Sequence, residues 1–175
     1  MNKIEINQNA KDASLSAENA ATERLRSKLW GRPGFLVRRL HQIHYALFFE
    51  ECDIEGVTPV QHGILTVLLN RPWVDQSAIS LELGLDRTTT ADVVRRLEEK
   101  MLVQRQVNPN DKRSRQVYIT PYGIEVMSQL RPKMQRAQER LVEPLSPEEQ
   151  EEFMRLLIRI VEANNDYGRT VLKKM

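Results

Sequence analysis

The chain has 175 residues, with 26 Lys or Arg against 24 Asp or Glu, so its formal net charge is +2. A hydrophobic fraction of 41% excludes a fully disordered chain, and the length favours one domain. No apolar run reaches the roughly 20 residues of a membrane span, and no signal-peptide core is visible. The single cysteine, Cys52, cannot form an intrachain disulfide, which favours a cytoplasmic location.

The N-terminal part of the chain divides into a polar tail and a basic segment. Residues 1–22 carry only scattered apolar side chains, too few to offset the entropy of ordering, so we expect a disordered polar tail. Residues 24–49 contain six Lys or Arg and no acid, and their apolar side chains recur at helical spacing. The pattern predicts one amphipathic helix over about 33–52, within a single domain over 23–175.

A second helix is predicted from its own start and stop signals. Thr58-Pro59 combines an N-capping hydroxyl with a proline at the first helical position. Ile64, Leu65 and Leu68 then recur at helical spacing, and we expect the helix to stop before Pro72.

Two aspartates delimit the next pair of helices. Asp75 is placed to cap a short helix over 76–83, and Gly84 is a typical residue after a helix C-terminus. Asp86 then caps a longer helix over 87–101 with one apolar stripe. A short helix, a tight turn that contains glycine and a longer helix together indicate a helix-turn-helix.

A β-hairpin is expected after this pair. Residues 103–107 and 115–119 are rich in β-forming side chains, whereas residues 108–114 between them are turn formers and charged residues. The hairpin should therefore have a polar, basic tip.

Two further helices are predicted at the C-terminal end. Thr120-Pro121 repeats the cap-and-proline start, and Pro132 within the pattern predicts a kink rather than an end. Ser146 opens a capping box with Glu149. The last helix carries the apolar residues Phe153, Leu156, Leu157, Ile160 and Val161.

Several motifs in this order resemble the MarR family of bacterial transcription regulators. The motifs are Asp86-Arg87-Thr88-Thr89-Thr90, Asn108-Pro109-Asn110-Asp111-Lys112-Arg113 and Thr120-Pro121-Tyr122-Gly123. The resemblance covers about residues 30–165. Ile119 is a departure, because most members carry leucine before that threonine.

The resemblance implies a mostly α fold and a DNA-binding function. It implies a winged helix-turn-helix with a two-stranded β wing over about 55–120, flanked by dimerisation helices over about 30–52 and 121–172. A homodimer would bind double-stranded DNA at a pseudo-palindromic operator. Such regulators usually repress until a small molecule or an oxidant releases them.

The residues themselves have suitable chemistry for DNA. The predicted contacts are Arg87, Thr88, Thr89, Thr90 and Arg95 on the second helix of the helix-turn-helix, and Lys112, Arg113 and Arg115 on the wing. Threonine hydroxyls and methyls can contact base edges in the major groove, and an arginine at the wing tip can enter a narrow minor groove. We assign base readout to the three threonines, the minor-groove contact to Arg113, and orientation of the wing to Asp111.

The distribution of charge favours the same orientation. Residues 86–115 carry eight basic and five acidic residues, whereas residues 139–162 carry three basic and seven acidic ones. The basic part would face phosphates and the acidic part would face away from them.

The first predicted helix resembles that of a MarR subgroup linked to the catabolism of aromatic acids. That resemblance implies a small aromatic acid or an aromatic acyl-CoA thioester as effector. The candidate ligand-binding residues are Arg32, Phe35, Arg38, Arg39, His41, His44, Tyr45, Phe48, Ile64 and Trp73. The arginines could pair with a carboxylate or with phosphates, although they could equally face solvent or DNA while the aromatic residues serve as plain core.

Other functions are weighed against this one. His41, His44 and His62 could form a zinc site, and Cys52 could be a redox switch, although neighbouring acids would raise the pKa of that thiol. The motifs of phosphate-binding loops, hydrolases and zinc proteases are absent, so we expect neither enzymatic activity nor a cofactor. A winged helix used for protein interaction, without an operator of its own, is the remaining alternative.

Overall fold

The computed structural model describes residues 22–24, 26–109, 111–168 and 170–172, and within this range it leaves out the side chains of Asp111, Arg113 and Ser114. The polar tail expected over 1–22 therefore lies outside the described residues, except for Thr22. Helix α2 (Pro33–Glu51) matches the predicted helix closely. The chain divides within α2 into two compact units, residues 1–43 and 44–175.

The described part of the first unit is helical and rich in exposed cations. Two of its arginines lie over aromatic rings: the guanidinium of Arg26 is 5.5 Å from the centre of the Trp30 ring, and that of Arg38 is 5.7 Å from the centre of the Phe35 ring. Such cation–π contacts shield one face of each ring while leaving the charge in water.

The predicted helix-turn-helix is confirmed in the second unit. Helix α3 (Pro59–Asn70) begins at the capping box of Thr58 and Gln61. Helices α4 (Gln76–Leu83) and α5 (Arg87–Glu99) begin at the predicted caps Asp75 and Asp86. Gly84 between them has a φ of +64°, a backbone conformation that is unfavourable for residues other than glycine. Helix α5 ends two residues earlier than predicted, because Met101 adopts a φ of +58°.

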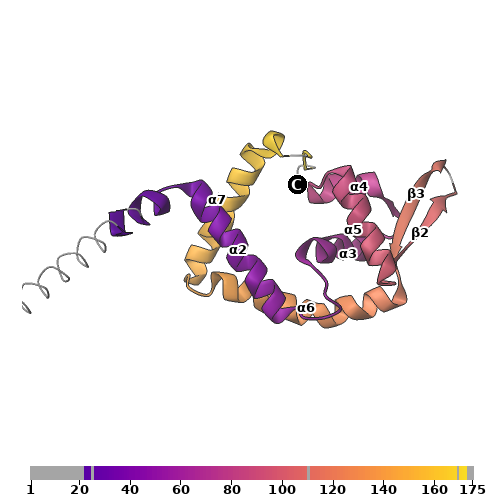
Figure 1. Cartoon of the computed structure of the whole chain (residues 1–175), viewed down its shortest axis with the longest axis horizontal. Coiled ribbons are helices and arrows are strands. Elements are labelled where there is room, and N and C mark those ends of the chain that lie inside the picture. Colours follow the sequence, from indigo (N-terminus) through magenta and orange to yellow (C-terminus); the bar gives the residue numbers. More distant parts are fainter. Residues whose placement is uncertain (1–21, 25, 110, 169, 173–175) are drawn as a thin grey trace, which may run out of the picture. The chain divides into compact units, whose positions relative to one another are not determined.

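The hairpin is also confirmed, and it belongs to a three-stranded antiparallel sheet. Strands β2 (Val103–Asn108) and β3 (Asp111–Ile119) pair along their length, with an irregularity between Val107 and Asn108. A two-residue strand, β1 (Val74–Asp75), pairs with the other edge of β3, which gives the order β1-β3-β2. In Figure 1 the hairpin projects beside α5 as the wing.

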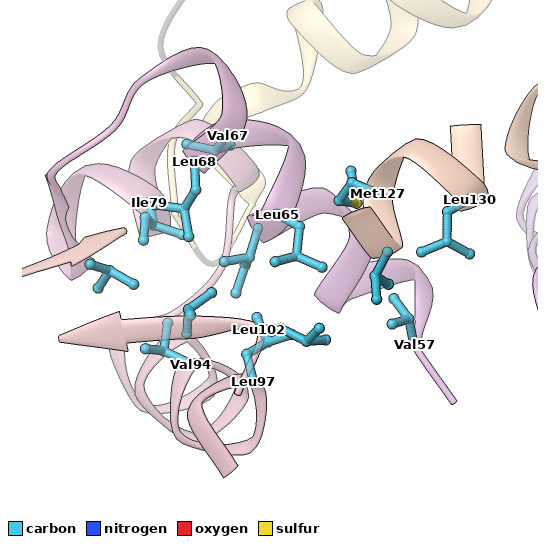
Figure 2. Close-up of a cluster of buried hydrophobic side chains, with 14 of the residues drawn as sticks. Val57, Leu65, Val67, Leu68, Ile79, Val94, Leu97, Leu102, Met127 and Leu130 are labelled. Atoms are coloured by element: carbon cyan, nitrogen blue, oxygen red, sulfur yellow. The ribbon is translucent and has the colours of Figure 1, made fainter. Parts of the chain in front are cut away.

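The core of the second unit lies between the helices of this lobe and one face of the sheet (Figure 2). Leu65 and Leu68 of α3 are fully buried there, with Leu97 of α5 and Leu102 just before β2. Leu130 brings the following helix into the same cluster. Burying side chains of this size contributes about 1.5–3 kcal/mol each, so the cluster is the main source of the lobe's stability.

The threonine and glycine of the Thr120–Gly123 motif join the wing to helix α6 (Pro121–Val142). The Thr120 hydroxyl donates to the Met101 carbonyl at 2.7 Å and accepts from the Gly123 N–H at 2.9 Å. A Cβ on Gly123 would lie 2.2 Å from the Leu102 carbonyl oxygen, so this position tolerates no side chain. Helix α6 continues through Pro132, which confirms that the helix does not end there. The kink expected at Pro132 stays a prediction.

Helix α7 (Pro147–Ala163) begins at the predicted capping box of Ser146 and Glu149 and leads to a short 3-10 turn, η1 (Asn165–Tyr167). None of its residues is buried within the chain. Its exposed apolar residues are Met154, Leu156, Ile158, Ile160 and Val161. In the part of the chain that is described, no helix combines the length and apolar character needed to cross a membrane.

Candidate nucleic-acid interface

The first turn of α5 is organised by Asp86. Its Oδ1 accepts from the Thr89 N–H at 2.8 Å, and its Oδ2 accepts from the Thr89 hydroxyl at 2.7 Å. Thr89 is half-buried, whereas Arg87 and Thr88 are exposed. The N-terminal end of α5 therefore presents one cation and one hydroxyl to the surroundings on a helix start that is held rigidly.

Thr90 does not belong to this exposed face. Its side chain is fully buried, donates to the Asp86 carbonyl at 3.0 Å and shares a 2.9 Å hydrogen bond with the Ser80 hydroxyl of α4. A hydroxyl that is used inside the lobe cannot reach a base edge in this conformation. The prediction that Thr90 reads bases is therefore wrong. This residue instead joins the two helices of the motif.

Arg95 is exposed but already paired. It donates to Asp92 at 2.7 Å and to Glu99, one turn to either side, and Arg96 pairs with the other oxygen of Asp92 at 2.8 Å. The hydrogen bond from Arg95 lowers the pKa of Asp92. A phosphate contact by Arg95 would have to replace exposed ion pairs, which are individually weak.

The wing is joined to α5 by a pair of charges. Arg105 of β2 donates to Glu98 of α5 through Nε at 2.9 Å and also through Nη2. Hydrogen bonds from Arg105, aided by the charge of Arg115, lower the pKa of Glu98. Residue type alone does not single out this pair, since both residues resemble ordinary surface charges.

The wing residues predicted to contact DNA are described in part. Lys112 and Arg115 are exposed on β3, which extends further toward the tip than predicted. The backbones of Asp111 and Arg113 lie in the same strand, but their side chains fall outside the described atoms, so their roles stay predictions.

The predicted ligand-binding residues are distributed over both units. Five of them belong to the first unit: Arg32, Phe35, Arg38, Arg39 and His41. Of these, Arg39 donates to Gln42 at 2.8 Å, and Phe35 is half-buried.

An aromatic cluster in the second unit contains several of the other candidates. His44 contacts Tyr45 edge to face at 5.9 Å between ring centres, Tyr45 contacts Phe49, and Phe48 contacts His62 at 6.2 Å. Burial lowers the pKa of His62, which keeps its ring neutral at neutral pH. Neutral imidazole beside aromatic rings can hydrogen-bond a polar group of a flat ligand.

The remaining candidates have other surroundings. Ile64 is fully buried in the hydrophobic core, as is Phe48 of the aromatic cluster. Trp73 is 45% exposed and packs against Tyr118 of β3, with 4.3 Å between ring centres. Its φ of +64° is unusual for a residue other than glycine.

The structure also contains a charged hollow that the sequence pattern does not predict. It has a volume of about 440 Å³ and is lined by Arg136, Glu139, Arg140, Val142, Glu143 and Gln150. Arg140 also pairs with Glu50 at 2.9 Å and Glu51 at 2.6 Å, which joins the end of α2 to α6. None of the predicted ligand-binding residues lines this hollow.

Two features bear on the sensing alternatives. Cys52 is 1% exposed, and burial, aided by the charge of Glu51, raises the pKa of its thiol. Among the residues that the structure describes, no three His, Cys, Asp or Glu side chains gather as metal ligands.

A three-helix lobe with an exposed, capped helix start beside a basic hairpin defines a winged-helix DNA-binding protein. The sequence profile of the MarR family matches residues 55–114. The chain is 29% identical over 151 residues to the putative transcriptional regulatory protein for the hcr operon of Thauera aromatica, covering 86% of this chain and 91% of that protein.

Solved structures agree with this match. The PcaV transcriptional regulator from Streptomyces coelicolor, in complex with its natural ligand, superimposes with a TM-score of 0.72 at 34% identity, over 77% of this chain and 95% of PcaV. BpsR from Bordetella bronchiseptica, whose DNA binding is regulated by 6-hydroxynicotinic acid, has the same fold, with a TM-score of 0.71 at 24% identity over 75% of this chain and 94% of BpsR.

The chain therefore belongs to the MarR family. It is a DNA-binding transcription regulator of a non-enzymatic family whose members are dimers.

Proposed function

We propose that this protein is a homodimeric repressor that leaves a pseudo-palindromic operator when it binds a small aromatic acid or an aromatic acyl-CoA thioester. The observation that carries the DNA-binding part is the exposed start of α5, with Arg87 and Thr88 held in place by the Asp86 cap. A helix start of this kind beside a basic hairpin fits the major groove and its flanking phosphates.

The proposed DNA contacts divide by chemistry. Thr88 reads bases, with Thr89 beside it, because hydroxyl and methyl groups can meet base edges. Arg87, Lys112 and Arg115 neutralise phosphates, and Arg95 assists once its ion pairs exchange. Arg113 takes the minor groove, where the negative potential is greatest.

The exposed apolar face of α7 supports the homodimer. Its residues Leu156 and Ile160 lie one turn apart on the same side of the helix and are exposed within the single chain, with Phe153 and Leu157 half-buried beside them. A row of large apolar side chains of this kind is typical of a surface that a partner covers. Two-fold pairing would place two recognition helices about 34–36 Å apart, one turn of DNA.

The effector assignment rests on the aromatic cluster and on the relatives. His44, Tyr45 and His62 combine ring edges with imidazole nitrogens, which suit a flat ring that carries polar groups. In the first unit, Arg38 and Arg39 remain candidates for pairing with a carboxylate or with CoA phosphates. An aromatic acid regulates DNA binding by BpsR, a protein of the same fold.

The proposal is tested by selecting bound duplexes from a random DNA pool and repeating the selection with effectors present. We expect an inverted repeat, and its loss in the presence of one aromatic acid or acyl-CoA thioester. Calorimetry with the same panel should give heat for that compound and less for Arg38→Ala. Arg71→Ala, which removes an exposed arginine paired with Glu82, is the matched control. If no compound of the panel gives a heat of binding, the proposed class of effector is refuted. If the selected DNA contains no repeat, the result favours the alternative of a winged helix used for protein interaction.

A further inference from the structure

The last described residues of the chain lie against the turn of the helix-turn-helix. Figure 1 shows the last described residues, in yellow, close to α4. The Thr170 hydroxyl donates to the Leu85 carbonyl at 2.8 Å, across 85 residues of sequence. Leu85 lies between Gly84, which ends α4, and Asp86, which caps α5.

An apolar contact accompanies this hydrogen bond. Leu172 packs closely on Gly84. A Cβ added to Gly84 would lie 3.2 Å from the Cδ2 atom of Leu172. Glycine at this position therefore has two roles: it permits the left-handed backbone that ends α4, and it leaves room for the Leu172 side chain.

The segment is closed on itself by Asn165. The Asn165 side chain accepts from the Leu172 N–H at 2.9 Å and donates to the Leu172 carbonyl at 2.9 Å. These bonds fasten the residue that touches Gly84 to η1, directly after the end of α7. We call residues 165–168 and 170–172 the C-terminal strap.

We propose that Thr170 and Leu172 are positioning residues for operator recognition. By holding the turn at residues 84–86, the C-terminal strap sets where the Asp86 cap lies and hence where Arg87 and Thr88 begin α5. It also ties the start of the recognition helix to α7. The proposal rests on the proposed binding of α5 to operator DNA.

This role predicts a loss of specificity rather than of general DNA affinity. Base readout requires the first turn of α5 to be placed within a fraction of an ångström, whereas phosphate attraction acts over longer distances and tolerates displacement. Release of the turn should therefore weaken operator binding more than binding to random duplex.

The test compares Thr170→Val with Thr170→Ser in the full chain, using the selected operator and a random duplex at one salt concentration. Thr170→Val keeps the shape but removes the donor, and we expect operator affinity to fall about fivefold, as for loss of one hydrogen bond, with little change for random duplex. Thr170→Ser should restore the wild-type ratio of the two affinities. Leu172→Ala should act like Thr170→Val, whereas Val171→Ala, an exposed neighbour in the same segment, should not.

Hydrogen exchange at the Thr89 amide, which is bonded to the Asp86 cap, supplies a readout independent of DNA. We expect faster exchange at this amide in Thr170→Val and wild-type exchange in Thr170→Ser. An unchanged affinity ratio in both Thr170→Val and Leu172→Ala would overturn the proposal, as would equal losses for operator and random duplex. Failure of the wild-type chain to bind any operator would instead refute the proposed function.

Discussion

Arg105 on β2 donates two hydrogen bonds to one carboxylate oxygen of Glu98 on α5, one of them at 2.9 Å. This pair connects the wing to the helix proposed to enter the major groove. The two elements proposed to face DNA are therefore held together by a side-chain ion pair, in addition to the backbone that joins them.

Glu98→Gln should weaken this connection in a pH-dependent way. Because Arg105 lowers the pKa of folded Glu98, the ionised carboxylate stabilises the fold above its unfolded pKa, and that stabilisation is lost as the pH falls through the folded pKa. The pair is partly exposed, so we expect Glu98→Gln to cost about 1 kcal/mol at neutral pH. Urea unfolding of both proteins at pH 7 and at successively lower pH should show the difference shrink in acid. A difference that grows as the pH falls would contradict this assignment.

Substitution of Thr90 should affect stability, whereas substitution of Thr88 should affect DNA recognition. Thr90→Val leaves the buried Ser80 hydroxyl without its Thr90 partner and should lower the free energy of unfolding by about 1–3 kcal/mol. Adding Ser80→Ala should recover part of that loss. Thr88→Ala, at an exposed position, should leave stability within about 0.5 kcal/mol and alter the selected operator sequence. Equal stability losses at the two threonines would contradict the assignment.

Arg87→Ala should reduce the salt dependence of operator binding. When one phosphate is no longer neutralised by the protein, the slope of log affinity against log salt becomes shallower by about 0.9. Lys112→Ala should act in the same direction, and Arg113→Ala should weaken binding by about 1–3 kcal/mol if its side chain enters the minor groove. Arg155→Ala removes an equal charge from α7, where that arginine pairs with Glu152, and should leave the slope unchanged. An identical effect of Arg87→Ala and Arg155→Ala would indicate only a change of net charge.

Ile160→Asp should dissociate the proposed dimer. Ile160 is 59% exposed on the apolar face of α7, so a carboxylate is tolerated in the single chain but would be buried in an interface. Sedimentation should give a larger monomer fraction than in wild type. Leu81→Asp, at an exposed apolar position on α4, is the control and should remain dimeric. A dimeric Ile160→Asp would exclude this face.

Cys52 should react slowly with thiol reagents while the protein is folded. Burial raises the pKa of the thiol and removes it from solvent, so little thiolate is available for attack. An aromatic disulfide reagent releases a coloured thiolate when it reacts with a cysteine, and this colour should appear only as urea unfolds the chain. Rapid reaction of the native protein, with release from operator DNA, would restore the redox-switch alternative.

The helix starts were predictable because their signals are local. Each of five helices begins at an N-cap whose side chain accepts a backbone hydrogen bond: Thr58, Asp75, Asp86, Thr120 and Ser146. An N-cap can be predicted from a few neighbouring residues, without knowledge of the rest of the fold. The hairpin could be predicted for the same reason, from turn formers between two β-rich stretches.

The features that were missed depend on tertiary structure. β1 has two residues, too short for any periodic pattern, and exists because β3 pairs with it. Thr90 has the same residue type as its exposed neighbour Thr88, and only its hydrogen bond with Ser80 distinguishes it as a buried residue. Trp73 shows the same limit, since its packing on Tyr118 depends on the sheet and not on its own sequence neighbours.

The central claim is that two copies of the chain bind one duplex through paired recognition helices. Sedimentation of the protein with a duplex that carries the selected inverted repeat tests it most directly. We predict two chains per duplex, and much weaker binding when one half of the repeat is scrambled. One chain per duplex, or equal binding to the intact and the half-scrambled repeat, would contradict the claim.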